Sequence, residues 1–231
     1  MKKLLSIAVL MILFINTKSQ VYVQGGVNLA NITQTASGET QDNNLLTTFN
    51  AGILGRFGLS KPIDLESGLL VTGRGAKANT YFSSSTEDNY VKTKFNPLYV
   101  EVPLNVVVRI PISKDENLFF NGGSYAEIGI AGKSKTETNA LGVTSTSSAN
   151  IKFSNDNPFT SKQDDASYNK LKRFGFGVNI GGGFELGSVI LKVNYEYGLT
   201  KINSTQSDNS VDNKNKYRTL SFSLGIPLGK G

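Results

Sequence analysis

The chain has 231 residues without a single Cys or His, which excludes disulfides, Cys/His metal sites and every catalytic mechanism that relies on a His or a thiolate. Charged residues make up only 18% of the chain, which is few for a soluble surface, and the formal net charge is +6.

The first segment of the chain has the composition of a signal peptide. Met1–Lys3 is a basic start, Leu4–Ile15 is a short apolar run, and Thr17–Ser19 carries the small residues of a cleavage site. The run is too short for a membrane-spanning helix, which needs about 20 apolar residues. We predict a cleaved signal peptide at 1–19 and one exported domain at 20–231. Loss of the leader lysines halves the net charge of +6, so no nucleic-acid partner is expected.

The exported part alternates apolar and polar residues with a period of two, which is the pattern of β-strands. Each predicted strand is long enough for the roughly 9–11 residues of a tilted membrane strand. Pro103 cannot donate a ladder hydrogen bond, so a bulge is expected at that residue. In chain order, the eight predicted strands are 21–30, 49–59, 64–74, 98–110, 118–132, 173–186, 189–199 and 219–228.

The charged residues of these strands share one face, and the opposite face is apolar. A soluble barrel directs its apolar face inward, whereas a membrane barrel reverses this arrangement. The low charge and the signal peptide favour an all-β, eight-stranded antiparallel up-and-down transmembrane β-barrel in the outer membrane. Its narrow lumen would be filled by side chains. The predicted lumen charge network consists of Arg56, Glu66, Arg74, Glu101, Arg109, Glu127, Glu185, Lys192 and Glu196.

The opposite charges in this network nearly balance, so we interpret it as a structural plug, with a conducting path and carboxylate catalysis as alternatives. The glycines of 175–183 do not fit a dinucleotide-binding fingerprint. We expect them to make room for side chains from the opposite wall of the lumen. We predict no enzyme activity, no cofactor and no metal.

The connections between the predicted strands alternate in length, as in outer-membrane barrels with periplasmic turns and long outer loops. The 133–171 loop is a candidate surface for a protein partner. The lysines in and beside it could attract anionic lipopolysaccharide: Lys133, Lys135, Lys152, Lys162, Lys170 and Lys172. The short connections are 60–63, 111–117 and 187–188, and the long polar ones are 31–47, 80–96, 133–171 and 201–216.

Five phrases carry a resemblance to a known family: GGVNLAN at 25–31, YVEVPL at 99–104, GGSYAE at 122–127, FGFGVNIGGGFEL at 174–186 and YEYGLT at 195–200. Together they resemble the PorT-type outer-membrane β-barrel proteins of Gram-negative bacteria, over essentially all of 20–231. The resemblance implies an eight-stranded barrel in the outer membrane and, from the namesake of the family, a link to secretion.

We therefore predict a non-catalytic outer-membrane β-barrel with a structural or interaction role through its long outward loops. The secretion-associated role follows from the resemblance alone. Two alternatives stay open, namely a narrow outer-membrane channel and a soluble lipocalin-like binding barrel in which the two strand faces are exchanged.

Overall fold

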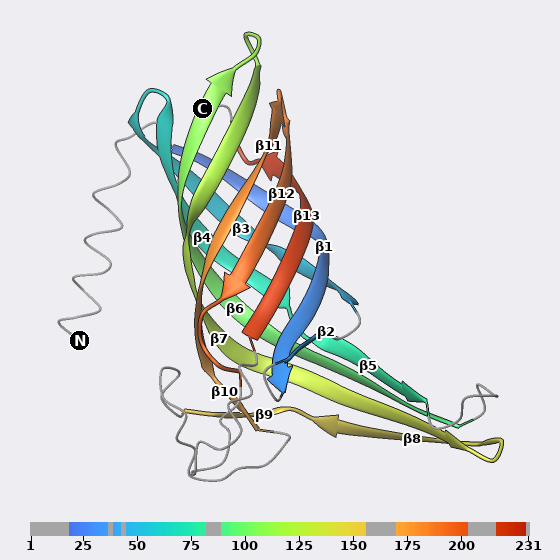
Figure 1. Ribbon diagram of the computed structural model, residues 1–231. Helices are drawn as coiled ribbons and strands as arrows, with labels where there is room; N and C mark the ends of the chain where they lie inside the picture. The colour runs from blue at the N-terminus through green and yellow to red at the C-terminus, as the bar shows by residue number, and fades with distance from the viewer. Residues whose placement is uncertain are drawn as a thin grey trace.

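The computed structural model describes residues 19–36, 39–42, 45–81, 89–155, 170–202 and 216–229, so the predicted signal peptide lies almost wholly outside the described residues. Eight antiparallel strands form a closed ring in which chain neighbours are also sheet neighbours, and pairing of the last strand with the first closes it (Figure 1). This confirms the predicted up-and-down barrel. The ring strands are β1 (Ser19–Ala36), β3 (Leu46–Ser60), β4 (Ile63–Gly73), β6 (Tyr90–Pro111), β7 (Glu116–Ala140), β11 (Phe174–Leu186), β12 (Val189–Gly198) and β13 (Lys216–Pro227).

The apolar face of each ring strand lies on the outside of the barrel. In β6, for example, Val102, Leu104 and Val106 are exposed, whereas the intervening Glu101 and Asn105 are buried. An exposed apolar wall around a polar interior is the arrangement that lipid requires. The soluble lipocalin-like alternative is therefore wrong, because it needs the apolar face to line the interior. Within the described ranges no helix is long and apolar enough to cross a membrane.

The sheet continues past the barrel into segments that we predicted to be loops. β6 and β7 stay paired from Tyr90↔Asn139 at the outer end to Pro111↔Asn117. β5 (Ala76–Tyr81) adds to the edge of β6, and β8 (Val143–Asn150) adds to the edge of β7. We call this four-stranded part, made of β5, residues 90–97, residues 132–140 and β8, the extension; Figure 1 shows it leaning away from the barrel. The loop boundaries predicted at 80–96 and 133–171 are wrong here, because Ser and Thr side chains are compatible with strands once a neighbouring edge satisfies their backbone groups.

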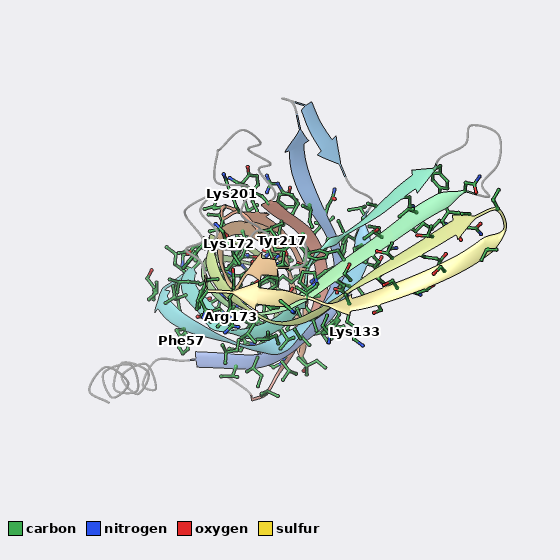
Figure 2. The ribbon with its side chains drawn as sticks, turned by 90° about the horizontal axis from the view of Figure 1, so that it is seen from below. Phe57, Lys133, Lys172, Arg173, Lys201 and Tyr217 are labelled. Carbon is green, nitrogen blue, oxygen red and sulfur yellow. The ribbon has the colours of Figure 1, made fainter. Side chains whose placement is uncertain are left out.

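Smaller elements cover the same end of the barrel. β2 (Glu39–Asp42) pairs with the end of β1, and β9 (Lys152–Ser154) pairs in parallel with β10 (Lys170–Lys172). A buried apolar cluster lies beneath them and contains Ile32, Ala76, Tyr99, Ile151, Leu171, Ile202 and Tyr217. Figure 2 looks onto this end and shows Tyr217 and Lys172 over the ring of strands. The cluster therefore covers the outer mouth of the lumen.

The predicted bulge at Pro103 is not present. β4 pairs with β6 in one register on both sides of that residue, from Ser67↔Leu104 to Leu70↔Glu101. The Ser67 hydroxyl donates a hydrogen bond of 2.7 Å to the Pro103 carbonyl, which holds the strands together where the proline lacks an N–H. The register of β6 with β7 shifts instead between Leu98 and Tyr99, where the barrel gives way to the extension.

Candidate functional site

The lumen contains an outer charge cluster centred on Arg74, which directly follows β4. Its guanidinium is fully buried and bridges three strands: Nε lies 2.7 Å from Glu127, Nη2 lies 2.5 Å from Glu101, and Nη1 lies 2.5 Å from Glu196. Nη1 also donates to the Thr219 hydroxyl at 3.0 Å. One arginine thus ties β6, β7, β12 and β13 together across the lumen.

A second, inner cluster lies nearer the periplasmic end. Arg56 Nε lies 2.7 Å from Glu66, and another of its nitrogens pairs with Glu185. Lys192 Nζ lies 2.5 Å from Glu66, whose carboxylate also accepts a 2.8 Å hydrogen bond from Tyr22. Two cations therefore face two carboxylates in this cluster, whereas Arg74 alone faces three.

Arg109 belongs to neither cluster. It pairs at 2.5 Å with Asp64 near the periplasmic mouth, and its side chain is 37% exposed. Asp64 is not among the residues predicted for the lumen charge network. The signal was available, because Asp64 precedes Glu66 by two residues and so lies on the same face of the strand. The structure thus divides the predicted residues into two buried clusters and one separate pair.

Amide side chains fill the space between the two clusters. Asn50 donates to Asn28 at 2.6 Å, and on the other side of the lumen Asn179 donates to Asn105 at 2.8 Å. Asn121 adds a 2.9 Å hydrogen bond to Asn194. The cavity in this layer has a volume of about 20 Å³, which is room for about one water molecule. Below the inner cluster, a cavity of about 1010 Å³ opens toward the periplasm, with Arg56 and Glu185 among its lining residues.

Glycines of β11 create the space for two of the lumen side chains. A Cβ added to Gly177 would lie 2.3 Å from the Tyr125 ring, and one added to Gly175 would lie 2.6 Å from a Glu127 carboxylate oxygen. These residues are direct cross-strand partners on β7, so the space serves the neighbouring strand. The expectation that it serves side chains from the opposite wall is wrong at these two glycines. Tyr125 in turn packs against Arg74, whose Cζ lies 4.9 Å from the ring centroid.

No group of His, Cys, Asp and Glu side chains suited to a metal ion occurs in the described part of the chain. In the two lumen clusters, the carboxylates are already bound to arginine or lysine side chains. Ion pairs of this kind hold neighbouring strands together. The inner cluster borders the cavity that opens toward the periplasm through Arg56 and Glu185, but both side chains are already engaged in ion pairs there.

Comparison with known proteins gives a family match over most of the chain. The family model described as "Outer membrane protein beta-barrel domain" matches residues 16–204. A search of curated proteins finds no match.

Several solved structures are similar at low sequence identity. Ail, the attachment invasion locus protein of Yersinia pestis, is 15% identical, with 91% of this chain and 99% of that chain covered and a TM-score of 0.40. Neisserial surface protein A is 12% identical, with 89% and 96% covered and a TM-score of 0.37. The outer membrane protease OmpT from Escherichia coli is 9% identical, with 90% and 97% covered and a TM-score of 0.32.

Proposed function

Because the chain belongs to the outer membrane protein β-barrel domain family, we propose that it is a closed, non-catalytic barrel that acts through its extracellular surface. The observation that carries this proposal is the filled lumen. Its buried charges are bound to opposite charges on other strands, and the cavity between the clusters measures about 20 Å³. A conducting path would require Arg74 to leave three buried carboxylates, which is costly in a medium of low dielectric constant.

The extension supports an interaction role. It projects from the barrel as a paired sheet and ends at the β7–β8 turn, where Leu141 is 91% exposed. A paired sheet presents side chains in a fixed arrangement, which lowers the entropy lost when a partner binds. We propose that a protein partner contacts this part of the 133–171 segment. The resemblance to PorT-type proteins supports a secretion-associated accessory role for that contact.

Single-channel recording in planar bilayers tests the closed lumen. The refolded barrel is expected to give no conductance steps above background at any holding potential, while an open porin in the same bilayers reports successful insertion. Reproducible steps from the barrel would contradict the proposal and favour the narrow channel.

Site-specific photo-cross-linking on intact cells tests the outer surface. A photoreactive residue at Leu141 is expected to form adducts, whereas the same residue at Leu59, exposed at the periplasmic end, serves as the matched control. Absence of adducts at Leu141, or identical adducts from both positions, would contradict a role of the extension.

Intact-mass measurement of the purified protein tests export by a signal peptide cleaved before Gln20.

A further inference from the structure

Three lysines stand side by side across three strands of the extension. The register pairs Lys77 of β5 with Lys94 of β6, and Lys94 with Lys135 of β7. Like charges directly opposite one another destabilise a sheet, because their side chains leave the same face within a few ångströms. No described carboxylate forms an ion pair with any of the three. We call Lys77, Lys94 and Lys135 the lysine row.

The lysine row lies on the face of the extension that continues the lipid-facing wall of the barrel. Ala76 and Phe95 pack into or against the buried cluster at the outer mouth, so their neighbours Lys77 and Lys94 face the opposite way. A Cβ on Gly132 would lie 2.8 Å from Ile151 of the same cluster, so Lys133 and Lys135 also face outward. Figure 2 shows Lys133 where the extension leaves the barrel.

Positive charge is concentrated on this face alone. It also carries Lys92 and Lys133, and its one carboxylate, Glu137, accepts a 2.8 Å hydrogen bond from Tyr90. The Lys92 ammonium lies 3.9 Å from the centroid of the Tyr90 ring. The opposite face of the described extension carries small, hydroxyl and apolar residues and no lysine.

We call the ring of lipid-facing apolar side chains on the barrel the apolar belt. The height of the lysine row above this belt matches the headgroup layer of the membrane. Lys94 is four residues beyond Leu98 on β6, and Lys135 is four residues beyond Ala131 on β7. At about 3.3 Å per residue and a strand tilt of about 40° or more, these positions are at most roughly 10 Å above the end of the belt. Headgroups occupy this zone of a bilayer.

We propose that the lysine row binds the phosphate groups of a phosphorylated glycolipid in the outer leaflet of the outer membrane. Ammonium groups bind phosphate as point charges, and a dianion between adjacent lysines removes their mutual repulsion. The acyl chains of the same lipid would contact the apolar belt directly below. This inference rests on the proposed role of the outer surface, and it names a lipid partner for the outward face of the extension.

Native mass spectrometry of the detergent-solubilised full-length barrel tests the proposal. The probes are bisphosphorylated lipid A and the same lipid A without phosphates. The variant K94Q/K135Q removes two members of the row, and K61Q/K114Q is the matched control with the same loss of charge on exposed periplasmic turns. At about 1 kcal/mol per lysine near an anionic surface, K94Q/K135Q is expected to bind the bisphosphorylated lipid about 30-fold more weakly.

The expected result is that the control variant binds like the wild type and that the dephosphorylated lipid binds weakly to all three proteins. Excess inorganic phosphate should not release the lipid. Equal binding by K94Q/K135Q and the wild type would overturn the proposal, as would equal binding of both lipids. Complete release by inorganic phosphate would assign the row to free phosphate and overturn the lipid partner. A boiling-dependent gel shift confirms that each variant is folded, and bilayer recordings report the closed lumen independently of these outcomes.

Discussion

Replacement of Arg74 by Met tests whether the outer charge cluster holds the barrel closed. The substitution keeps a side chain of similar length but removes the guanidinium that bridges Glu101, Glu127 and Glu196 at 2.5 to 2.7 Å. Three buried carboxylates then face one another without a cation. Removal of one partner from a buried ion pair costs about 3–5 kcal/mol, because the remaining charge has lost both its solvent and its counter-ion. R74M is therefore expected to lose at least about 3 kcal/mol of unfolding free energy.

Urea unfolding of the refolded barrel in detergent, followed by the boiling-dependent gel shift, measures this loss. R109Q is the comparison, because Arg109 is 37% exposed and pairs with one carboxylate, Asp64; its expected loss is smaller than that of R74M, since one buried carboxylate and not three loses its counter-ion. The double variant R74M/E101Q should recover part of the stability, since it leaves one buried charge fewer. Equal stability of R74M and R109Q would refute the assignment of Arg74 as the central cation of the lumen.

Two further substitutions test the outside of the barrel and the packing inside it. V106K places a charge on the exposed apolar face of β6 and is expected to lower the unfolding free energy in lipid bilayers by roughly 2–4 kcal/mol. L141K at the exposed turn is expected to leave it unchanged. Equal effects of the two variants in urea titrations would contradict the lipid-facing assignment of β6. G177A puts a methyl group 2.3 Å from the Tyr125 ring and should cost about 1–3 kcal/mol by the same assay. G25A, with nothing within 4 Å of the added Cβ, should unfold like the wild type, and a G177A variant that did so as well would contradict the close packing of Tyr125.

The alternation of side chains in β6 illustrates what local sequence was able to predict. A strand in a closed barrel has only two faces, so the period of two assigned Val102, Leu104 and Val106 to one environment and Glu101 and Asn105 to the other. The composition of the faces, with every strand charge on one side, predicted a polar lumen. The number of strands followed from counting such segments.

The partners within the lumen depended on distances across the barrel. Arg74 and Glu196 are 122 residues apart, and Arg56 and Glu185 are 129 apart, so neither pair leaves a local signal. Only the register and closure of the ring bring them together. The same reason explains why the sequence suggested one nearly balanced network, whereas the folded chain divides it into a neutral inner cluster and an outer cluster with a single arginine.

The extension likewise depends on strand pairing that its local sequence does not reveal. Its segments read as polar loops because, taken one at a time, Ser, Thr, Asn and Lys residues lack an apolar stripe. Pairing with neighbouring strands made them a sheet, and it aligned Lys77, Lys94 and Lys135 although 58 residues separate the first from the last. The sequence by itself determined the eight strands of the barrel, their two faces and the location in the outer membrane, because these depend on periodicity and composition. Tertiary structure alone decided which charges meet in the lumen and which lysines stand in a row, because both depend on strand register.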